Sequence, residues 1–293
     1  MASKFSHPWL ATGSLLVAAT MWGLLWYPMR LLEQAGLPGL WATLIAYTVA
    51  SVVGIASGFR YLTEFVRYPA WLLGLAVAAG WCNVAFILAI IDGNVVRVVL
   101  LFYLSPLWTV LLGRLFLGEH IDRAAALVLT VAMGGALLML WDPSIGVPWP
   151  QVEADWMAIS AGFAFAVNNV IVRGSGHVAL VAKNTAAWVG GAALAGVWIA
   201  VAGPVLPTPA PGAWWAAVAL GLLGIVIMTV TVQYGVTHMP VRRSAIILLF
   251  ELVVATVSAQ LLAHEALLPR EWLGGALIVA SAVIAARWKE NAS

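Results

Sequence analysis

The chain has 293 residues, of which 63% are hydrophobic and 9% charged, and its formal net charge is +2. Soluble domains carry about 25% charged residues, so this composition excludes a water-soluble fold of this size. The net charge is close to neutral, and the chain has no basic tract that would bind nucleic acid. The single cysteine, Cys82, excludes an intramolecular disulfide framework. No cleavable signal is expected, because the first eight residues lead directly into an apolar run too long for a signal peptide.

Apolar runs of about 20 residues recur along the whole chain and predict an all-α polytopic membrane protein. The alternating pattern of an outer-membrane barrel is absent. Ten spans are predicted, at residues 10–30, 38–58, 70–91, 95–117, 123–141, 156–173, 184–203, 213–237, 242–263 and 271–288. The longest connector, 142–155, separates two halves of five spans each.

The lysines and arginines fall unevenly on alternate sides of these spans. One side holds eleven: Lys4, Arg60, Arg67, Arg114, Arg123, Arg173, Lys183, Arg242, Arg243, Arg287 and Lys289. The other side holds the remaining three of the 14, Arg30, Arg97 and Arg270. By the positive-inside rule, this division predicts that both termini are cytoplasmic.

A weak internal repeat relates the two halves. A shift of 146 residues (243 − 97) places Arg97 on Arg243, Ser105 on Glu251 and Glu119 on Glu265. Because five is odd, the second half enters the membrane from the opposite side. The sequence therefore predicts two inverted five-helix repeats, at 10–141 and 156–288, with an external linker at 142–155, an architecture found in many secondary transporters.

Polar groups inside a bilayer are costly and are often functional. We expect spans 1, 3, 4, 6, 8 and 9 to line a central cavity. The predicted substrate-binding residues are Trp22, Trp81, Asn83, Tyr103, Trp108, Asn168, Gln233, Tyr234, Ser244 and Glu251. Aromatic and aliphatic groups would hold the substrate side chain, and amides and hydroxyls its backbone groups.

Glu251 is the only carboxylate near the centre of any predicted span, and it shares a helical face with Ser244 and Ser258. One interpretation is that it exchanges a proton or meets a substrate amine. The other is a buried structural carboxyl that is protonated or bonded to a neighbouring helix.

Each of the other candidate residues also has a simpler structural interpretation. The amides can bind a zwitterion or join helices. The deep tryptophans can form cavity walls or face lipid. Pro106 cannot donate to the Phe102 carbonyl, which leaves either a simple kink or an acceptor for substrate. For Arg97 and Arg243, an anchor at the headgroups is favoured over a gate.

The chain lacks the residues that characterise several classes of enzyme. The chain has no phosphate-binding P-loop sequence, no His-rich or Cys-rich metal set, and no recognisable Ser/His/Asp arrangement. We therefore expect no catalytic residues, no metal and no cofactor, and predict that the protein is not an enzyme.

The pair Trp22-Gly23, the segment Arg97–Trp108 and the glutamates Glu119 and Glu265 resemble the drug/metabolite transporter (DMT) superfamily in its ten-helix EamA branch. The segment RVVLLFYLSPLW is similar to that of the aromatic amino acid exporter (YddG-like) subfamily. The second half departs from this pattern, with Leu252 where the first has Pro106. Small multidrug members use a glutamate in their first helix, and span 1 has none here, so their proton-for-cation mechanism is not carried over.

This resemblance implies a bacterial inner-membrane exporter that moves aromatic and other neutral amino acids outward by alternating access. Two alternatives remain: a multidrug or metabolite exporter of lipophilic cations, and a non-saturable channel. The expected partners are small-molecule substrates, amino acids above all, and the lipid bilayer. A monomer is consistent with the sequence.

Overall fold

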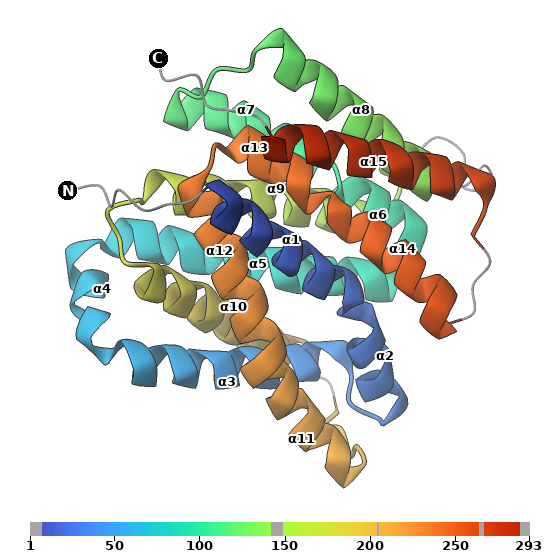
Figure 1. Ribbon diagram of the computed structural model, residues 1–293. Coiled ribbons are helices and arrows are strands. Elements are labelled where there is room, and N and C mark those ends of the chain that lie inside the picture. Colours follow the sequence, from blue (N-terminus) through green and yellow to red (C-terminus); the bar gives the residue numbers. More distant parts are fainter. Residues whose placement is uncertain (1–7, 142–148, 204, 264–266, 288–293) are drawn as a thin grey trace.

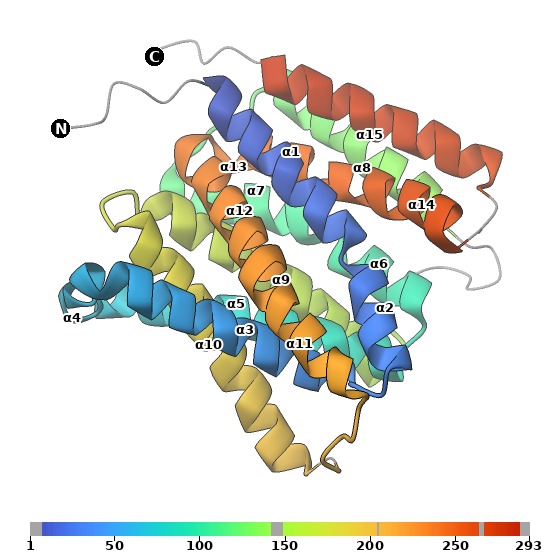
Figure 2. The same ribbon diagram turned by 60° about the horizontal axis from the view of Figure 1, so that its bottom comes forward.

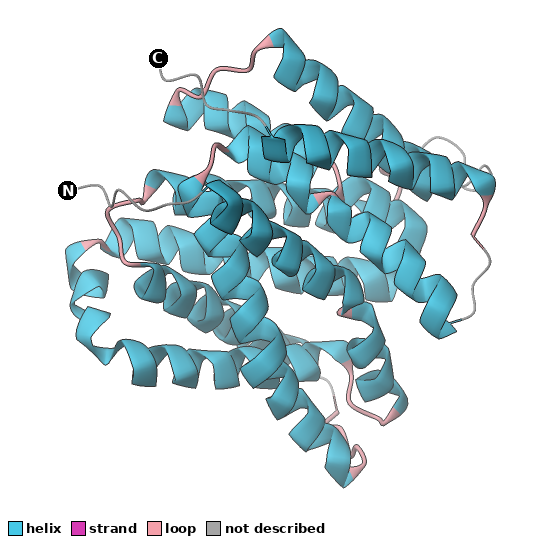
Figure 3. Cartoon of the chain, viewed as in Figure 1, coloured by secondary structure: helices cyan, strands magenta, loops and turns pink. Residues whose placement is uncertain are grey.

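The structure is a computed structural model that describes residues 8–141, 149–203, 205–263 and 267–287. Every regular element in these ranges is a helix (Figure 3). Ten helical stretches are long and apolar enough to cross a membrane, and each overlaps one predicted span. The edges differ by at most four residues, at 30 against Gln34 and at 184 against Leu180. The prediction of an all-α polytopic membrane protein is confirmed. Glu265, the predicted equivalent of Glu119 in the second half, lies outside the described residues.

The helices of the first half are α1 (Pro8–Leu24), α2 (Trp26–Gln34), α3 (Gly39–Gly58), η1 (Phe59–Tyr61), α4 (Thr63–Arg67), α5 (Pro69–Asp92), α6 (Val95–Phe102), α7 (Ser105–Leu117) and α8 (Arg123–Leu140). Those of the second half are α9 (Glu153–Gly174), α10 (Leu180–Ala202), α11 (Pro211–Ala219), η3 (Leu220–Ile225), α12 (Val226–His238), α13 (Val241–Leu248), α14 (Phe250–Ala263) and α15 (Pro269–Arg287).

Local sequence sets many of the helix ends. Pro69 and Pro211 begin α5 and α11, where the missing N–H would have had no partner within the helix. The Asp122 side chain accepts a 2.6 Å hydrogen bond from the Ala125 N–H and caps α8. Gly118 ends α7 with φ of 67°, a left-handed conformation that favours glycine.

Both spans of the predicted repeat segment are broken at equivalent positions. Span 4 is interrupted between Phe102 and Ser105, and span 9 at Leu249, which follows Tyr103 by 146 residues (249 − 103). Proline explains the first break, because residue 106 has no N–H for the Phe102 carbonyl. The second break occurs without a proline, so the two halves share this irregularity despite the Leu252 difference.

Helix packing divides much of the bundle into two groups. The first helix group contains α5, α6, α7, α9 and α10, in which α5 packs on α9 and α10, and α9 packs on α6 and α7. The second helix group contains α1, α12, α13 and α14, with α1 lying between α12 and α14 (Figure 2). The pair α8 and α15 lies along one side of the molecule and α3 lies on the other (Figure 1).

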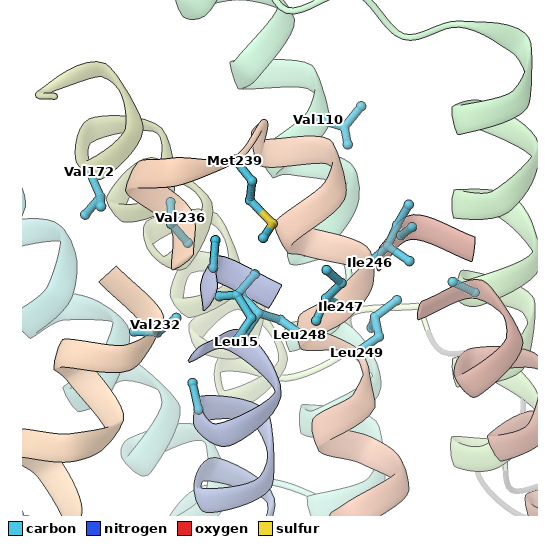
Figure 4. Packing of buried hydrophobic residues seen from close by; sticks show 14 of the residues in the cluster. Leu15, Val110, Val172, Val232, Val236, Met239, Ile246, Ile247, Leu248 and Leu249 are labelled. Carbon is cyan, nitrogen blue, oxygen red and sulfur yellow. The ribbon is translucent and has the colours of Figure 1, made fainter. Parts of the chain in front are cut away.

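The largest apolar core lies where the two groups meet. It contains Leu15 of α1, Val172 of α9 and Ile247 of α13, all buried (Figure 4). Burying such aliphatic side chains contributes about 1.5 to 3 kcal/mol each in water-soluble proteins, but in a bilayer the gain comes from close packing. The two helix groups are therefore joined by matched apolar surfaces as well as by the polar contacts described below.

One end of the bundle gathers most of the basic residues. Arg243 at the start of α13 donates to Thr12 Oγ1 near the start of α1 and to the Ala286 carbonyl near the end of α15. The first and last helices thus begin and end on the same side, as an even number of spans requires. We call this side the basic end; it carries Arg60, Arg67, Arg114, Arg123, Arg173, Lys183, Arg242, Arg243 and Arg287.

Candidate functional site

A carboxyl group and a hydroxyl group meet between the two helix groups, beside the broken parts of spans 4 and 9. Tyr103 lies in the interruption between α6 and α7, and Glu251 is in the first turn of α14. Their side chains lie close enough to interact electrostatically, and Tyr103 is only 9% exposed. The contact joins the first helix group to the second, and it brings together two residues predicted from the sequence.

Span 1 packs closely against the same point. A Cβ atom added at Gly23 would lie 2.6 Å from the Glu251 carbonyl oxygen, so only glycine allows this approach of α1 to α14. The neighbouring Trp22 is half-buried and packs against the core. The sequence-predicted pair Trp22-Gly23 therefore lies beside Glu251.

Span 3 brings further polar groups to this region. The Cys82 thiol interacts electrostatically with Glu251 and with Tyr47 of α3. The Tyr47 hydroxyl donates a 2.8 Å hydrogen bond to Asn83 Oδ1, and Asn83 Nδ2 donates to the Ala79 carbonyl. The Tyr47–Asn83 bond links α3 to α5, and Cys82 lies within electrostatic range of Glu251 in α14. We call Tyr47, Cys82, Asn83, Tyr103 and Glu251 the central polar cluster.

Two predicted tryptophans lie within the first helix group, on surfaces that face α9. Trp81 Nε1 donates a 3.2 Å hydrogen bond to Ser160 Oγ, and the Trp108 ring packs edge-on against Phe163 at 5.8 Å. Trp108 Nε1 is buried and makes no hydrogen bond to a described residue. No described contact joins either ring to the central polar cluster.

The other predicted amides, Asn168 and Gln233, lie nearer the basic end and are incompletely bonded. Asn168 Nδ2 makes only a long 3.5 Å contact with Asn169 Oδ1. Among the described residues, Asn168 Oδ1, Asn169 Nδ2 and Gln233 Oε1 find no hydrogen-bond partner, although all three atoms are buried. Buried amides normally have partners, so these atoms are available to water or to a ligand.

The remaining two predictions lie near the basic end. Ser244 is fully buried, and its hydroxyl donates to the Val241 carbonyl of its own helix. Tyr234 stacks on His238 with ring centroids 4.2 Å apart. Tyr234 also lines a hollow of about 220 Å³ between α1 and α12, together with Leu10, Ser14, Val230 and Thr231. This hollow does not include Glu251.

Arg97 and Arg243, for which the sequence favoured an anchor at the headgroups, both bind protein groups. The Arg97 guanidinium lies 3.4 Å from Asp155 Oδ2, and Arg97 Nη1 donates to Gln151 Oε1. Arg243 is 9% exposed and donates to the ends of α1 and α15. A terminal arginine with bound partners inside the protein has less freedom to snorkel.

Sequence reasoning missed the most deeply buried cation. Lys183 was placed in the loop before span 7, but α10 begins at Leu180 and the residue is 1% exposed. Its Nζ donates to the Val172 carbonyl at 3.1 Å and to Thr237 Oγ1 at 2.8 Å. The available signal was the apolar segment 178–182 that precedes it, which extends the hydrophobic run of span 7 toward the N-terminus.

No described group of three or more His, Cys, Asp or Glu side chains could hold a metal ion. The ten apolar helices, with polar side chains gathered between two helix groups, define the class of a polytopic membrane transport protein. The sequence profile of the EamA-like transporter family matches residues 9–141 and 153–287, and the chain belongs to this family. The two matched segments correspond closely to the two five-span halves.

Similar proteins cover most of the chain. It is 27% identical over 238 residues to an uncharacterized transporter of Archaeoglobus fulgidus, covering 78% of this chain and 80% of the relative. It is 28% identical over 275 residues to protein RarD of Streptomyces exfoliatus, covering 90% and 84%. One crystal structure superposes with a TM-score of 0.77 at 22% identity over 94% of this chain and 96% of the other, a likeness of fold alone.

Proposed function

We propose that the protein exports amino acids, aromatic and other neutral ones, from the cytoplasm by alternating access. The observation that carries this proposal is the contact between Tyr103 and Glu251 at the junction of the two helix groups. A carboxyl group in a membrane interior suits the ammonium group of a substrate or a coupled proton. The unpartnered Asn169 Nδ2 is a donor that suits the carboxylate of the same zwitterion, whereas the unpartnered oxygens of Asn168 and Gln233 are acceptors that suit an ammonium group.

The proposed location is the bacterial inner membrane, with the basic end and both termini in the cytoplasm. The positive-inside rule supports this orientation, since the basic end carries nine of the described lysines and arginines and the opposite end carries Arg30, Arg97 and Arg270. The proposed repeat boundaries, 10–141 and 156–288, agree with two separate matches to one family profile. An inverted pair of halves would place the central polar cluster near the bilayer midplane.

One observation favours a second candidate, the export of lipophilic cations. Glu251 lies beside the aromatic residue Tyr103, and a carboxyl group beside an aromatic ring is a suitable environment for a quaternary amine. Such a substrate would need the carboxylate more than the amides.

Counterflow in proteoliposomes separates these possibilities. We expect labelled neutral amino acids to exchange saturably against an excess of unlabelled substrate on the other side, with and without a pH gradient. Exchange of quaternary amines alone would favour the second candidate. Flux without saturation or counterflow would indicate a channel, and no flux of any amino acid would refute the amino-acid proposal.

A further inference from the structure

The turn between α12 and α13 is buried, which is unusual for a connection between two spans. Met239 and Val241 are 2% and 1% exposed, and Pro240 between them is also buried. Figure 4 shows the Met239 side chain within the apolar cluster formed by α1, α12 and α13. This turn belongs to the second helix group, yet it is enclosed by residues of the first.

Three charged side chains of the first helix group hold this turn. Arg173 Nη1 donates to the Thr237 carbonyl at 2.9 Å, and Lys183 Nζ donates to Thr237 Oγ1 at 2.8 Å. Glu119, just after α7, accepts from the Val241 N–H at 2.9 Å through Oε2 and from Arg173 Nε at 3.2 Å through Oε1. We call Glu119, Arg173 and Lys183 the clasp.

The clasp lies on one side of the central polar cluster. Both Thr237 and Val241 are at the basic end, and Arg242 adds a fourth contact there by donating to the His120 carbonyl at 2.8 Å. Toward the opposite end, the contact of Arg97 with Asp155 joins α6 to α9 within the first group, and that of Trp26 with Ser258 joins α2 to α14. Among the described residues, the side-chain hydrogen bonds between the two groups are concentrated at the basic end.

We infer that Lys183 and the other clasp residues form the gate of the basic end, and that the structure shows this gate closed. Helix groups that rock about a fixed site must break their contacts at one end while they make contacts at the other. Lys183 suits this role because its only described hydrogen bond to the second group is to the neutral Thr237 hydroxyl, so no direct ion pair has to break when the groups separate. The inference rests on the proposed alternating access and does not depend on the substrate.

The native Cys82 reports on the gate, since it is the only cysteine of the chain and belongs to the central polar cluster. The experiment measures its alkylation by a membrane-impermeant maleimide added from either side of oriented vesicles. Glu119→Gln and Lys183→Met should each raise the rate from the basic end by at least about tenfold, since the first removes the charge of an acceptor and the second removes a charged donor. Cys82→Ser confirms the labelled site.

Glu271→Gln is the matched control, because this half-buried carboxylate accepts from the Leu268 N–H at the opposite end of the bundle. It should leave the rate unchanged. Thr237→Val is a milder variant that removes the acceptor of Lys183 and should act in the same direction if Lys183→Met fails to fold. Unchanged rates from the basic end in folded clasp variants would overturn the gate, even where counterflow of amino acids persists. Conversely, faster labelling without any amino-acid flux would support the gate and refute only the substrate.

Discussion

Glu251 is placed by contacts on three sides. Tyr103 meets its carboxyl group from the first helix group, Cys82 lies within electrostatic range, and Gly23 allows α1 to touch its backbone. A membrane-buried carboxyl group with so few bonding partners keeps acceptor capacity for a substrate. Its equivalent in the first half is Ser105, which is 2% exposed, so the two halves contribute chemically different groups.

Replacement of Glu251 by Gln tests whether this carboxylate binds an ammonium group. We expect Glu251→Gln to lower the counterflow rate at subsaturating amino acid by at least about tenfold, because a hydrogen bond to a charged group contributes about 1.5 to 3 kcal/mol. Tyr103→Phe should have a smaller effect and should add little to Glu251→Gln, since the two side chains interact directly. Full additivity of the two substitutions would show that the Tyr103 contact is irrelevant to binding.

Helices of the first group approach one another so closely that single glycines determine their packing. A Cβ atom at Gly190 of α10 would overlap the backbone of Ala76 in α5. Gly134 of α8, in contrast, has no atom within 4 Å of an added Cβ. Small residues at such crossings are typical of membrane helix pairs, where packing provides much of the stability.

These two glycines predict opposite results for the same substitution. Gly190→Ala should lower the thermal stability in detergent, since overpacking costs about 1 to 3 kcal/mol. Gly134→Ala should leave it unchanged or raise it, because alanine is favoured over glycine in a helix by about 1 kcal/mol. Melting followed by tryptophan fluorescence compares them directly. Equal melting temperatures would mean that α5 and α10 do not pack as described.

The spans were predictable because apolar runs of membrane length leave few alternatives, and all ten overlap described helices. Their irregular parts were less accessible. Pro106 signals the break in span 4, but the break at Leu249 has no proline, and the π-helical turn at Leu220–Ile225 has no local signal. Such irregularities are stabilised by tertiary contacts, which a single sequence does not reveal.

The predicted site residues were selected by residue type and depth, which finds Trp22, Tyr103 and Glu251 near one another but cannot give the direction of each side chain. Trp81 and Trp108 lie at similar depth yet contact α9. Lys183 was overlooked because a charged residue beside a span boundary is normally placed in the loop, and the four-residue error at Leu180 moved it outside the helix. Whether the ten predicted residues bind substrate stays a prediction.

At the scale of the whole molecule, the direction of export depends on which side of the membrane the basic end faces. Val66 in α4 at the basic end and Val205 after α10 at the other end are 85% and 89% exposed, so cysteines at these positions are matched probes. In a Cys82→Ser background, we expect an impermeant maleimide to label Val205→Cys in intact cells and Val66→Cys only after the inner membrane is opened. This result follows from the excess of lysine and arginine at the basic end.

Double labelling with two different dyes provides the internal control, because each cell preparation then reports both positions. The reverse pattern would place the basic end outside. The gate would then close the external side, and the proposed direction of transport would be inward. Labelling of both positions from the same side would contradict the described path of the chain, in which five spans, the third to the seventh, separate the two residues. Because each span crosses the bundle once, an odd number of spans places positions 66 and 205 on opposite sides.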